Sequence, residues 1–332
     1  MPNKGFYTQG FAILLDNEVP LDRIVDAISD EFKVVKRIDK SSDWAISGPA
    51  ITIEYQKEIN GYISADVVNA TWPDGMGDPQ KESMIFGAWA MGHFGPFTYP
   101  GNLLRASYNC WSYPEGKKHA QEHKAFIRIC SSYIFGSVSK NAPCIPEDYD
   151  VISEMMFLTK LTRKLLDIPE ALCYFNPNGE VLASKEIIDS LLDRQVEIGL
   201  LPLELWANVR LFNLPDNNDW MLMDTVGMLQ LDTSDHEAIF DKNSYDLNEV
   251  GNFLRNASNY VFQNGPVIKD GDTMDGPGGI RWQGATFEEG VSSPPREVIR
   301  WFPMDNKKRP EGFVKADNKD GKKGFLKRFF KK

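Results

Sequence analysis

The N-terminal region changes from the apolar run of a strand to the spacing of a helix. Residues 10–15 form a short apolar run that predicts a buried strand. Residues 21–28 then carry apolar side chains at helical spacing, after a proline that suits a helix start. We therefore expect Ile24, Val25 and Ile28 to lie on the buried face of a first helix.

Three β-rich segments follow this helix, at residues 32–37, 50–55 and 62–68. The last two are joined through Asn60-Gly61, a dipeptide typical of a hairpin turn. The order strand, helix, strand, strand is how a ferredoxin-like unit or a related α/β sandwich begins.

The second half of the chain repeats this mixture of patterns. Helical spacing is found at residues 148–166, 185–196 and 247–263, and β-rich runs at 171–175, 203–212, 221–225, 279–287 and 298–302. The whole pattern predicts an α+β fold of mixed, mainly antiparallel sheets packed with helices. The two halves are candidates for a pair of related ferredoxin-like units, although no sequence repeat proves a duplication.

The length of 332 residues favours two domains over one continuous core. The segment at 141–146 carries two prolines and is the best predicted boundary. We therefore predict an N-terminal α+β domain at residues 1–145, a C-terminal α+β domain at 146–304, and a flexible basic tail at 305–332.

Charge is distributed unevenly between the body of the protein and this tail. Residues 305–332 hold 11 Lys/Arg and 4 Asp/Glu, a net charge of +7, so residues 1–304 carry -17 of the total of -10. An acidic body argues against nucleic acid as a partner, because phosphate contacts need clustered Lys and Arg. It favours a basic protein partner instead.

Cysteine usage and hydropathy bear on the compartment. The four cysteines have no CxxC spacing, and no apolar stretch has the length of a signal-peptide core or of a membrane span. This pattern predicts a cytoplasmic protein with reduced thiols.

One motif suggests metal chemistry. Residues His119, Glu122 and His123 form an H-x-x-E-H pattern, in which two histidines on one helical face hold zinc and the glutamate acts on zinc-bound water. Three lysines surround the motif, and its local pattern leaves room for only two helical turns. A polar, partly exposed helix is the simpler interpretation, with no cofactor, and no residue is singled out as catalytic.

Residues 89–113 are unusually aromatic and are interrupted by glycines and prolines. Such a segment builds either a rigid loop over a core or a pocket or interface. The candidate pocket or interface residues are Trp89, His93, Phe97, Tyr99, Arg105 and Trp111.

The chain ends in a short amphipathic segment. Phe325, Leu326, Phe329 and Phe330 fall on one side of a helix formed by residues 324–332, and Lys327 and Arg328 fall on the other side. Nine residues are too few to span a bilayer, so the pattern predicts weak contact with a partner or with an anionic inner membrane at its periphery. The alternatives are a fold-back onto the acidic body and a solubilising end with no further role.

Four stretches together resemble a bacterial family that is defined only by a domain of unknown function. They are GHFGPFTYPGNLLRA at 92–106, ALCYFNPNGEVL at 171–182, ELWANVRLFNL with MDTVGMLQLDTSDHEAIF across 204–240, and NASNYVFQNGPVIKDGDTMDG at 256–276. The likeness covers most of residues 5–303. It implies no catalytic residues, and it implies an association with secretion-system or polymorphic-toxin genes.

Three classes of function remain open. The absence of a complete catalytic set in the sequence favours a non-enzymatic binding protein, such as an immunity or adaptor protein that captures a basic toxin. A metal-dependent hydrolase using the H-x-x-E-H motif is the first alternative. A structural component of a secretion or envelope assembly is the second.

Overall fold

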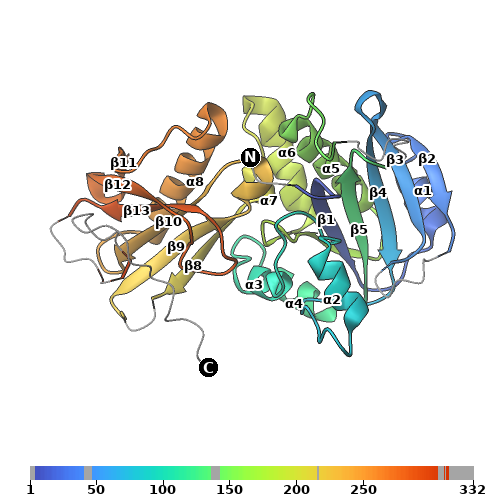
Figure 1. Cartoon of the computed structure of the whole chain (residues 1–332), viewed down its shortest axis with the longest axis horizontal. Coiled ribbons are helices and arrows are strands. Elements are labelled where there is room, and N and C mark those ends of the chain that lie inside the picture. The colour runs from blue at the N-terminus through green and yellow to red at the C-terminus, as the bar shows by residue number, and fades with distance from the viewer. Residues whose placement is uncertain are drawn as a thin grey trace.

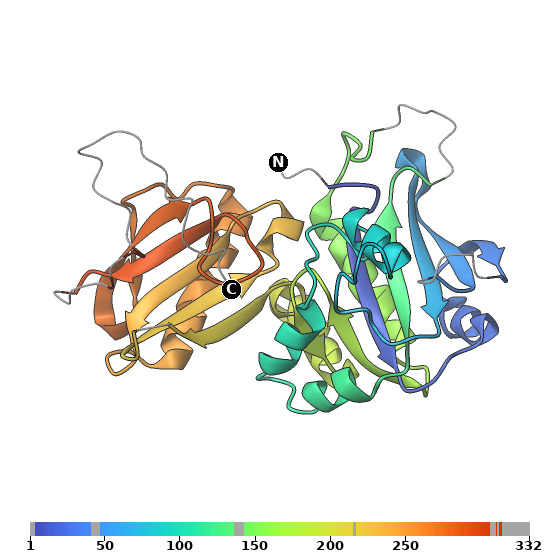
Figure 2. The ribbon, with the colours of Figure 1, turned by 60° about the horizontal axis from the view of Figure 1, so that its bottom comes forward.

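The computed structural model describes residues 4–40, 47–135, 143–214, 217–305, 310 and 312–313. In these residues the chain forms two β-sheets that lie side by side, each with its own helices (Figures 1 and 2). We call the part that contains the seven-stranded sheet the N-terminal lobe and the part that contains the six-stranded sheet the C-terminal lobe.

The seven-stranded sheet has the order β2-β3-β4-β5-β1-β6-β7, and all neighbouring strands run antiparallel. Its strands are β1 (Gln9–Leu15), β2 (Val34–Ile38), β3 (Ala50–Gln56), β4 (Gly61–Val68), β5 (Ala125–Ser132), β6 (Ala171–Asn176) and β7 (Val181–Ala183). A short 3₁₀ turn, η1 (Lys57–Ile59), connects β3 and β4.

Strand β1 shows why both faces of this sheet are covered. All seven of its residues are buried. Phe11, Ile13 and Leu15 point into one apolar cluster, while Ala12 and Leu14 point into another on the opposite face. This alternation is the period of two expected for a strand, and burial on both sides explains its continuous apolar run.

Different helices build the two clusters. The first contains residues of α1 (Leu21–Ile28), α5 (Val151–Leu165), α6 (Lys185–Ile198) and α7 (Leu203–Trp206). The second contains residues of α2 (Ser83–Ala90) and α3 (Asn102–Tyr108), with α4 (Gly116–Glu122) packed beside them. Helices α2 to α4 lie together on one side of the sheet in Figure 1.

The six-stranded sheet has the order β11-β12-β13-β10-β9-β8. Its strands are β8 (Asn208–Asn213), β9 (Trp220–Val226), β10 (Asp235–Asp241), β11 (Thr273–Gly276), β12 (Ile280–Phe287) and β13 (Val298–Pro303), with 3₁₀ turns η2 (Met228–Leu231) and η3 (Pro277–Gly279). Only β10 and β13 pair in parallel among the described strands. Helix α8 (Leu247–Asn264) packs Phe253 and Leu254 against Trp282 and Trp301 of this sheet.

The predicted α+β class with mainly antiparallel sheets is confirmed, whereas the duplication into ferredoxin-like halves is not. Strands β6 and β7 belong to the N-terminal sheet, so the division between the sheets falls after α7 instead of at residue 145. On α1, Ile24 and Ile28 are buried as predicted, but Val25 is only half-buried.

Two of the differences from the sequence pattern concern α7 and β10. The predicted strand at 203–212 is in fact helix α7 followed by β8. Strand β10 was not predicted, because a buried strand that begins with Asp235, His236 and Glu237 lacks an apolar signature.

Among the described residues, no helix is long and apolar enough to cross a membrane.

Candidate functional site

The six aromatic-region candidates do not converge on one site. Trp89 is buried and its indole donates a hydrogen bond to the carbonyl of Pro73 at 3.0 Å, so it belongs to the core. His93 is half-buried, and burial lowers the pKa of its ring. The other four, Phe97, Tyr99, Arg105 and Trp111, lie at three different features of the molecule.

Trp111 is one of three exposed large apolar side chains on and directly after α3. Leu104 and Tyr108 are four residues apart and share one face of this helix. The exposed fractions are 55% for Leu104, 60% for Tyr108 and 67% for Trp111. We call these three residues the α3 surface. The ammonium of Lys117 lies 4.8 Å from the centre of the Tyr108 ring at its margin.

Arg105 belongs to a chain of alternating charges that crosses from one lobe to the other. Its members, in order of contact, are Arg105, Glu180, Arg210, Asp224, Arg296 and Asp235. We call this set the charge chain. Arg105 is at the partly exposed end, and the five other side chains are at most 2% exposed.

The contacts within the charge chain are short and paired. Arg105 donates from Nε to Glu180 at 2.7 Å, and Arg210 donates to the other oxygen of Glu180 at 2.7 Å. Arg210 also holds Asp224 in a bidentate pair at 3.0 and 2.6 Å. Arg296 donates to Asp224 at 2.7 Å and lies 3.2 Å from Asp235. Three positive and three negative groups therefore neutralise one another.

The pKa values of the acids follow from their neighbours. Burial raises the pKa of Asp224, but the charges of Arg210 and Arg296 outweigh burial and hold that pKa below its usual value. Burial raises the pKa of Glu180 and of Asp235, and their arginine partners offset only part of that rise. Of the three acids, only Asp224 therefore has a pKa below its usual value, so it is the one that stays ionised to the lowest pH.

The backbones of the two lobes approach closely beside the charge chain. A side chain at Gly227 of the C-terminal lobe would lie 2.6 Å from the carbonyl oxygen of Trp206 and 2.7 Å from the Cα atom of Gly179. Within the N-terminal lobe, a side chain at Gly179 would lie 2.1 Å from the same carbonyl oxygen. Gly227 also has φ of 117°, which only glycine adopts readily. Both positions therefore need a residue without a side chain.

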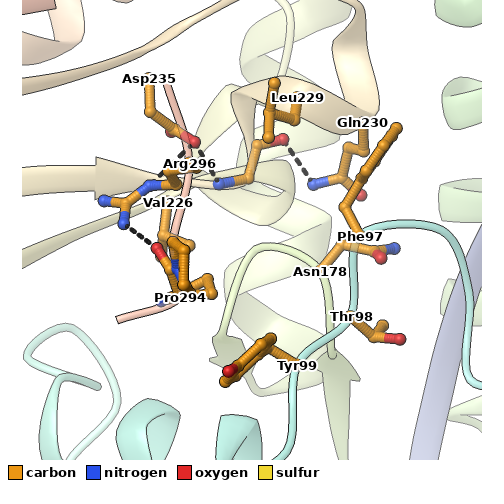
Figure 3. Close-up of a pocket in the computed structure, with 12 residues that line it drawn as sticks. Phe97, Thr98, Tyr99, Asn178, Val226, Leu229, Gln230, Asp235, Pro294 and Arg296 are labelled. Atoms are coloured by element: carbon orange, nitrogen blue, oxygen red, sulfur yellow. Dashed lines mark hydrogen bonds and ion pairs between the residues drawn. The ribbon is translucent and has the colours of Figure 1, made fainter. Parts of the chain in front are cut away.

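A cavity of about 160 Å³ lies at this junction. Phe97 and Tyr99 line it from the N-terminal lobe, and Leu229, Pro294 and Arg296 line it from the C-terminal lobe (Figure 3). The cavity is thus built from loops that are more than a hundred residues apart in sequence. Two of its lining residues were among the sequence candidates, but nothing in the sequence placed them near residues 226–235 or 294–296.

The three side chains of the H-x-x-E-H pattern contact different partners and do not gather at one site. Helix α4 ends at Glu122, and His123 has extended backbone angles. The His119 ring is hydrogen-bonded to the hydroxyl of Tyr113 at 2.5 Å. The exposed carboxylate of Glu122 lies 3.8 Å from Lys118.

Both ring nitrogens of His123 are occupied by hydrogen bonds. Nε2 accepts from the backbone N–H of Trp72 at 2.8 Å, and Nδ1 lies 2.8 Å from the carbonyl of Ala120, which can only accept. Burial lowers the pKa of this ring, in keeping with a neutral histidine that anchors a loop. Throughout the described residues, no group of three or more His, Cys, Asp or Glu is placed to hold a metal ion.

The predicted tail residues Phe325, Leu326, Lys327, Arg328, Phe329 and Phe330 lie outside the described residues. The described residues of the predicted tail at 305–332 include one that contacts the C-terminal lobe. Phe313 packs beside the cluster of Leu222 and Phe302, and its carbonyl accepts a hydrogen bond from Arg300 at 2.8 Å.

Fold and site together define a two-lobed α+β protein with a neutralised, largely buried charge chain, a partly open cavity at the lobe junction and exposed apolar side chains on and after α3. Residues 224–302 match the model of a family described as a domain of unknown function (DUF4261). The matched segment runs from Asp224 in β9 to Phe302 in β13 and includes three members of the charge chain. No curated protein and no solved structure matches the chain.

Proposed function

We propose that this chain is a non-catalytic binding protein that captures a basic protein partner in the cytoplasm of a bacterial cell. The observation that carries the proposal is the α3 surface. Large aromatic side chains are enriched at the centres of protein interfaces, and Tyr108 and Trp111 are each at least 60% exposed. Isolated exposed apolar residues need no explanation, but three on one short segment favour an interface.

The charge of the protein indicates the chemistry of the partner. Many arginines of the described residues are paired with carboxylates of the same chain, including Arg23, Arg37, Arg163, Arg194 and Arg281 at the surface. The net charge of -17 on residues 1–304 is therefore carried by carboxylates in excess of these pairs. Such a field accelerates association with a positively charged protein.

An immunity or adaptor protein is the role within this class that we favour. A basic toxic enzyme is the partner that fits, since an acidic inhibitor is complementary to an enzyme that binds an anionic substrate. The charge chain is consistent with a binding role, because each of its three carboxylates is already paired with an arginine of the same chain.

The experiment is a capture assay from cells that naturally produce the protein. The bait is the full-length chain, compared with a Tyr108→Ser, Trp111→Ser double variant. The matched control is Val196→Ser, Ile198→Ser, which changes two side chains that are 80% and 64% exposed at the end of α6. We expect one stoichiometric basic protein on the wild-type and control baits, released by salt and lost from the α3 variant.

Retention of the same protein by the α3 variant would place the interface elsewhere. Recovery of no stoichiometric protein by the wild-type bait would contradict the binding role itself.

A further inference from the structure

The cavity at the lobe junction is the second feature that needs an explanation. It is separate from the α3 surface and is a partly open cavity lined by loops of both lobes (Figure 3). Its volume of about 160 Å³ is close to that of engineered cavities that take up a molecule the size of benzene. Junctions between domains are common places for small-molecule sites.

Most of the wall is apolar. Phe97 and Tyr99 supply aromatic rings, and Leu229, Pro294 and Pro295 supply aliphatic surface. A wall of this composition favours a ligand with an apolar ring or chain.

The two charged residues of the wall, Arg296 and Asp235, form an ion pair, so neither offers a free charge to a ligand. Arg296 lies 3.2 Å from Asp235, and its remaining N–H groups donate to Asp224 and to the carbonyls of Ser292, Pro294 and Thr225. Asp235 also accepts from the hydroxyl of Thr225 and from the backbone N–H of Met228. A charged ligand would lose part of its hydration in this cavity and would meet no free counter-charge there, so the occupant is a neutral molecule.

Two polar atoms of the wall have no hydrogen-bond partner in the described part of the chain, Arg296 Nε and Asn178 Oδ1. Arg296 Nε still lies in the ion pair with Asp235 at 3.2 Å, whereas Asn178 Oδ1 has no such pair. Asn178 is 4% exposed and its amide nitrogen donates to the carbonyl of Gly10 at 3.3 Å. Its Oδ1 atom has no hydrogen-bond partner anywhere in the described part of the chain. Buried polar atoms are almost always paired, so this acceptor indicates a ligand that brings an O–H or N–H group.

The loop that supplies Phe97 is held in a strained form. Phe97 has φ of 59°, in the left-handed region that a bulky residue avoids. The loop lies directly on β1, where a side chain at Gly10 would be 2.7 Å from the carbonyl oxygen of Phe94. Strain of this kind concentrates at binding sites, where the surroundings fix one geometry of the wall.

We propose that this cavity binds a small neutral cyclic molecule that carries one hydroxyl or N–H group. The ring lies against Phe97, Leu229 and Pro294, and the polar group donates to Asn178 Oδ1. This function goes beyond capture of a protein partner and does not depend on it.

The test compares phenol and fluorobenzene, which are nearly equal in size, with the larger benzoate. Phenol has the donor, fluorobenzene lacks it, and benzoate is charged. We expect full-length protein to bind phenol about tenfold more tightly than fluorobenzene, since only phenol pairs the buried acceptor, and to bind benzoate more weakly than either. Calorimetric titration measures the affinities, and a crystal structure with phenol locates the ring.

Two variants connect the binding to this cavity. Asn178→Leu removes the acceptor and should make the affinities for phenol and fluorobenzene equal. Leu229→Trp fills the space from a half-buried wall position and should abolish binding of both, so it decides the question if Asn178→Leu does not fold. The control, Leu104→Ser on the α3 surface, should leave both affinities unchanged.

Three results would overturn the proposal. They are wild-type protein that binds none of the probes, equal wild-type affinity for phenol and fluorobenzene, and undiminished binding by the Leu229→Trp variant. The capture assay is independent of these results, since its variants lie outside the cavity.

Discussion

His236 is the clearest case of a single residue whose chemistry depends on burial. Its ring is fully buried in β10, and Nδ1 accepts a hydrogen bond from the indole of Trp301 at 3.0 Å. Burial alone lowers the pKa of His236 to about 3. The ring is therefore neutral in the folded protein at any pH near neutrality.

This burial makes stability dependent on pH. In the unfolded chain the histidine takes up a proton below its ordinary pKa of about 6.5, whereas the folded protein does not until about pH 3. The free energy of unfolding should therefore fall as pH drops from about 6.5 to 3, by up to about 1.4 kcal/mol per pH unit from this group. Urea denaturation at several pH values measures the slope.

The variant His236→Gln keeps an acceptor for Trp301 but cannot titrate. It should show a shallower loss of stability between pH 6.5 and 3 than the wild type, and a constant difference from it above pH 7. The same slope in both proteins would contradict the assignment to His236. His93 and His123, whose pKa values burial also lowers, account for part of the slope that remains.

At the scale of the element, α1 shows how a short helix is stabilised by packing. It has eight residues and no side-chain hydrogen bond at its N-cap. A helix of this length is not stable alone in water. Its buried residues Leu21, Ile24 and Ile28 join the main core cluster of the N-terminal lobe.

The substitution Ile24→Ala should therefore lower the free energy of unfolding by roughly 2–4 kcal/mol, as other large-to-small changes in cores do. The half-buried neighbour Val25 offers a matched comparison, and Val25→Ala should have a clearly smaller effect. Chemical denaturation with a fluorescence readout measures both. Equal effects of the two variants would mean that the burial pattern of α1 is different.

At the scale of the whole molecule, the lobes are joined by polar contacts as well as by packing. Besides the charge chain, Gln9 donates to the carbonyl of Gln230 at 2.9 Å, and Lys4 pairs with Asp232 at 3.0 Å. Of these contacts, the charge chain should lose the most stability when one member is removed, because each buried group is paired with a group from another segment.

Removal of one central charge should expose this dependence. Arg210→Met leaves Glu180 and Asp224 without their main partner in a buried site, which typically costs about 3–5 kcal/mol. The control Arg281→Met breaks an exposed pair with Asp275, where about 0–1 kcal/mol is expected. A thermal or urea unfolding experiment compares the variants, and a similar small loss in both would show that the charge chain does not stabilise the junction.

The sequence by itself predicted the elements whose pattern is local. The apolar run of β1, the helical spacing of α1 and the amphipathic α5 and α8 were all readable, because the period of two or of 3.6 is a property of neighbouring residues. The α+β class followed from these elements. The short segment at 203–206 was misassigned, since four apolar and acidic residues fit a helix turn as well as a strand.

The tertiary structure alone decided which polar residues are buried together. Arg105 and Arg296 are 191 positions apart in the chain, yet both belong to the charge chain. Strand β10 is buried even though it begins with Asp235, His236 and Glu237, because partners from other segments pair their side chains. A charge or a hydrogen-bond acceptor can be buried where a residue distant in the sequence pairs with it. The sequence pattern contains no signal for such a pairing. For the same reason the cavity at Asn178 was not predictable: its wall exists only where the two lobes touch.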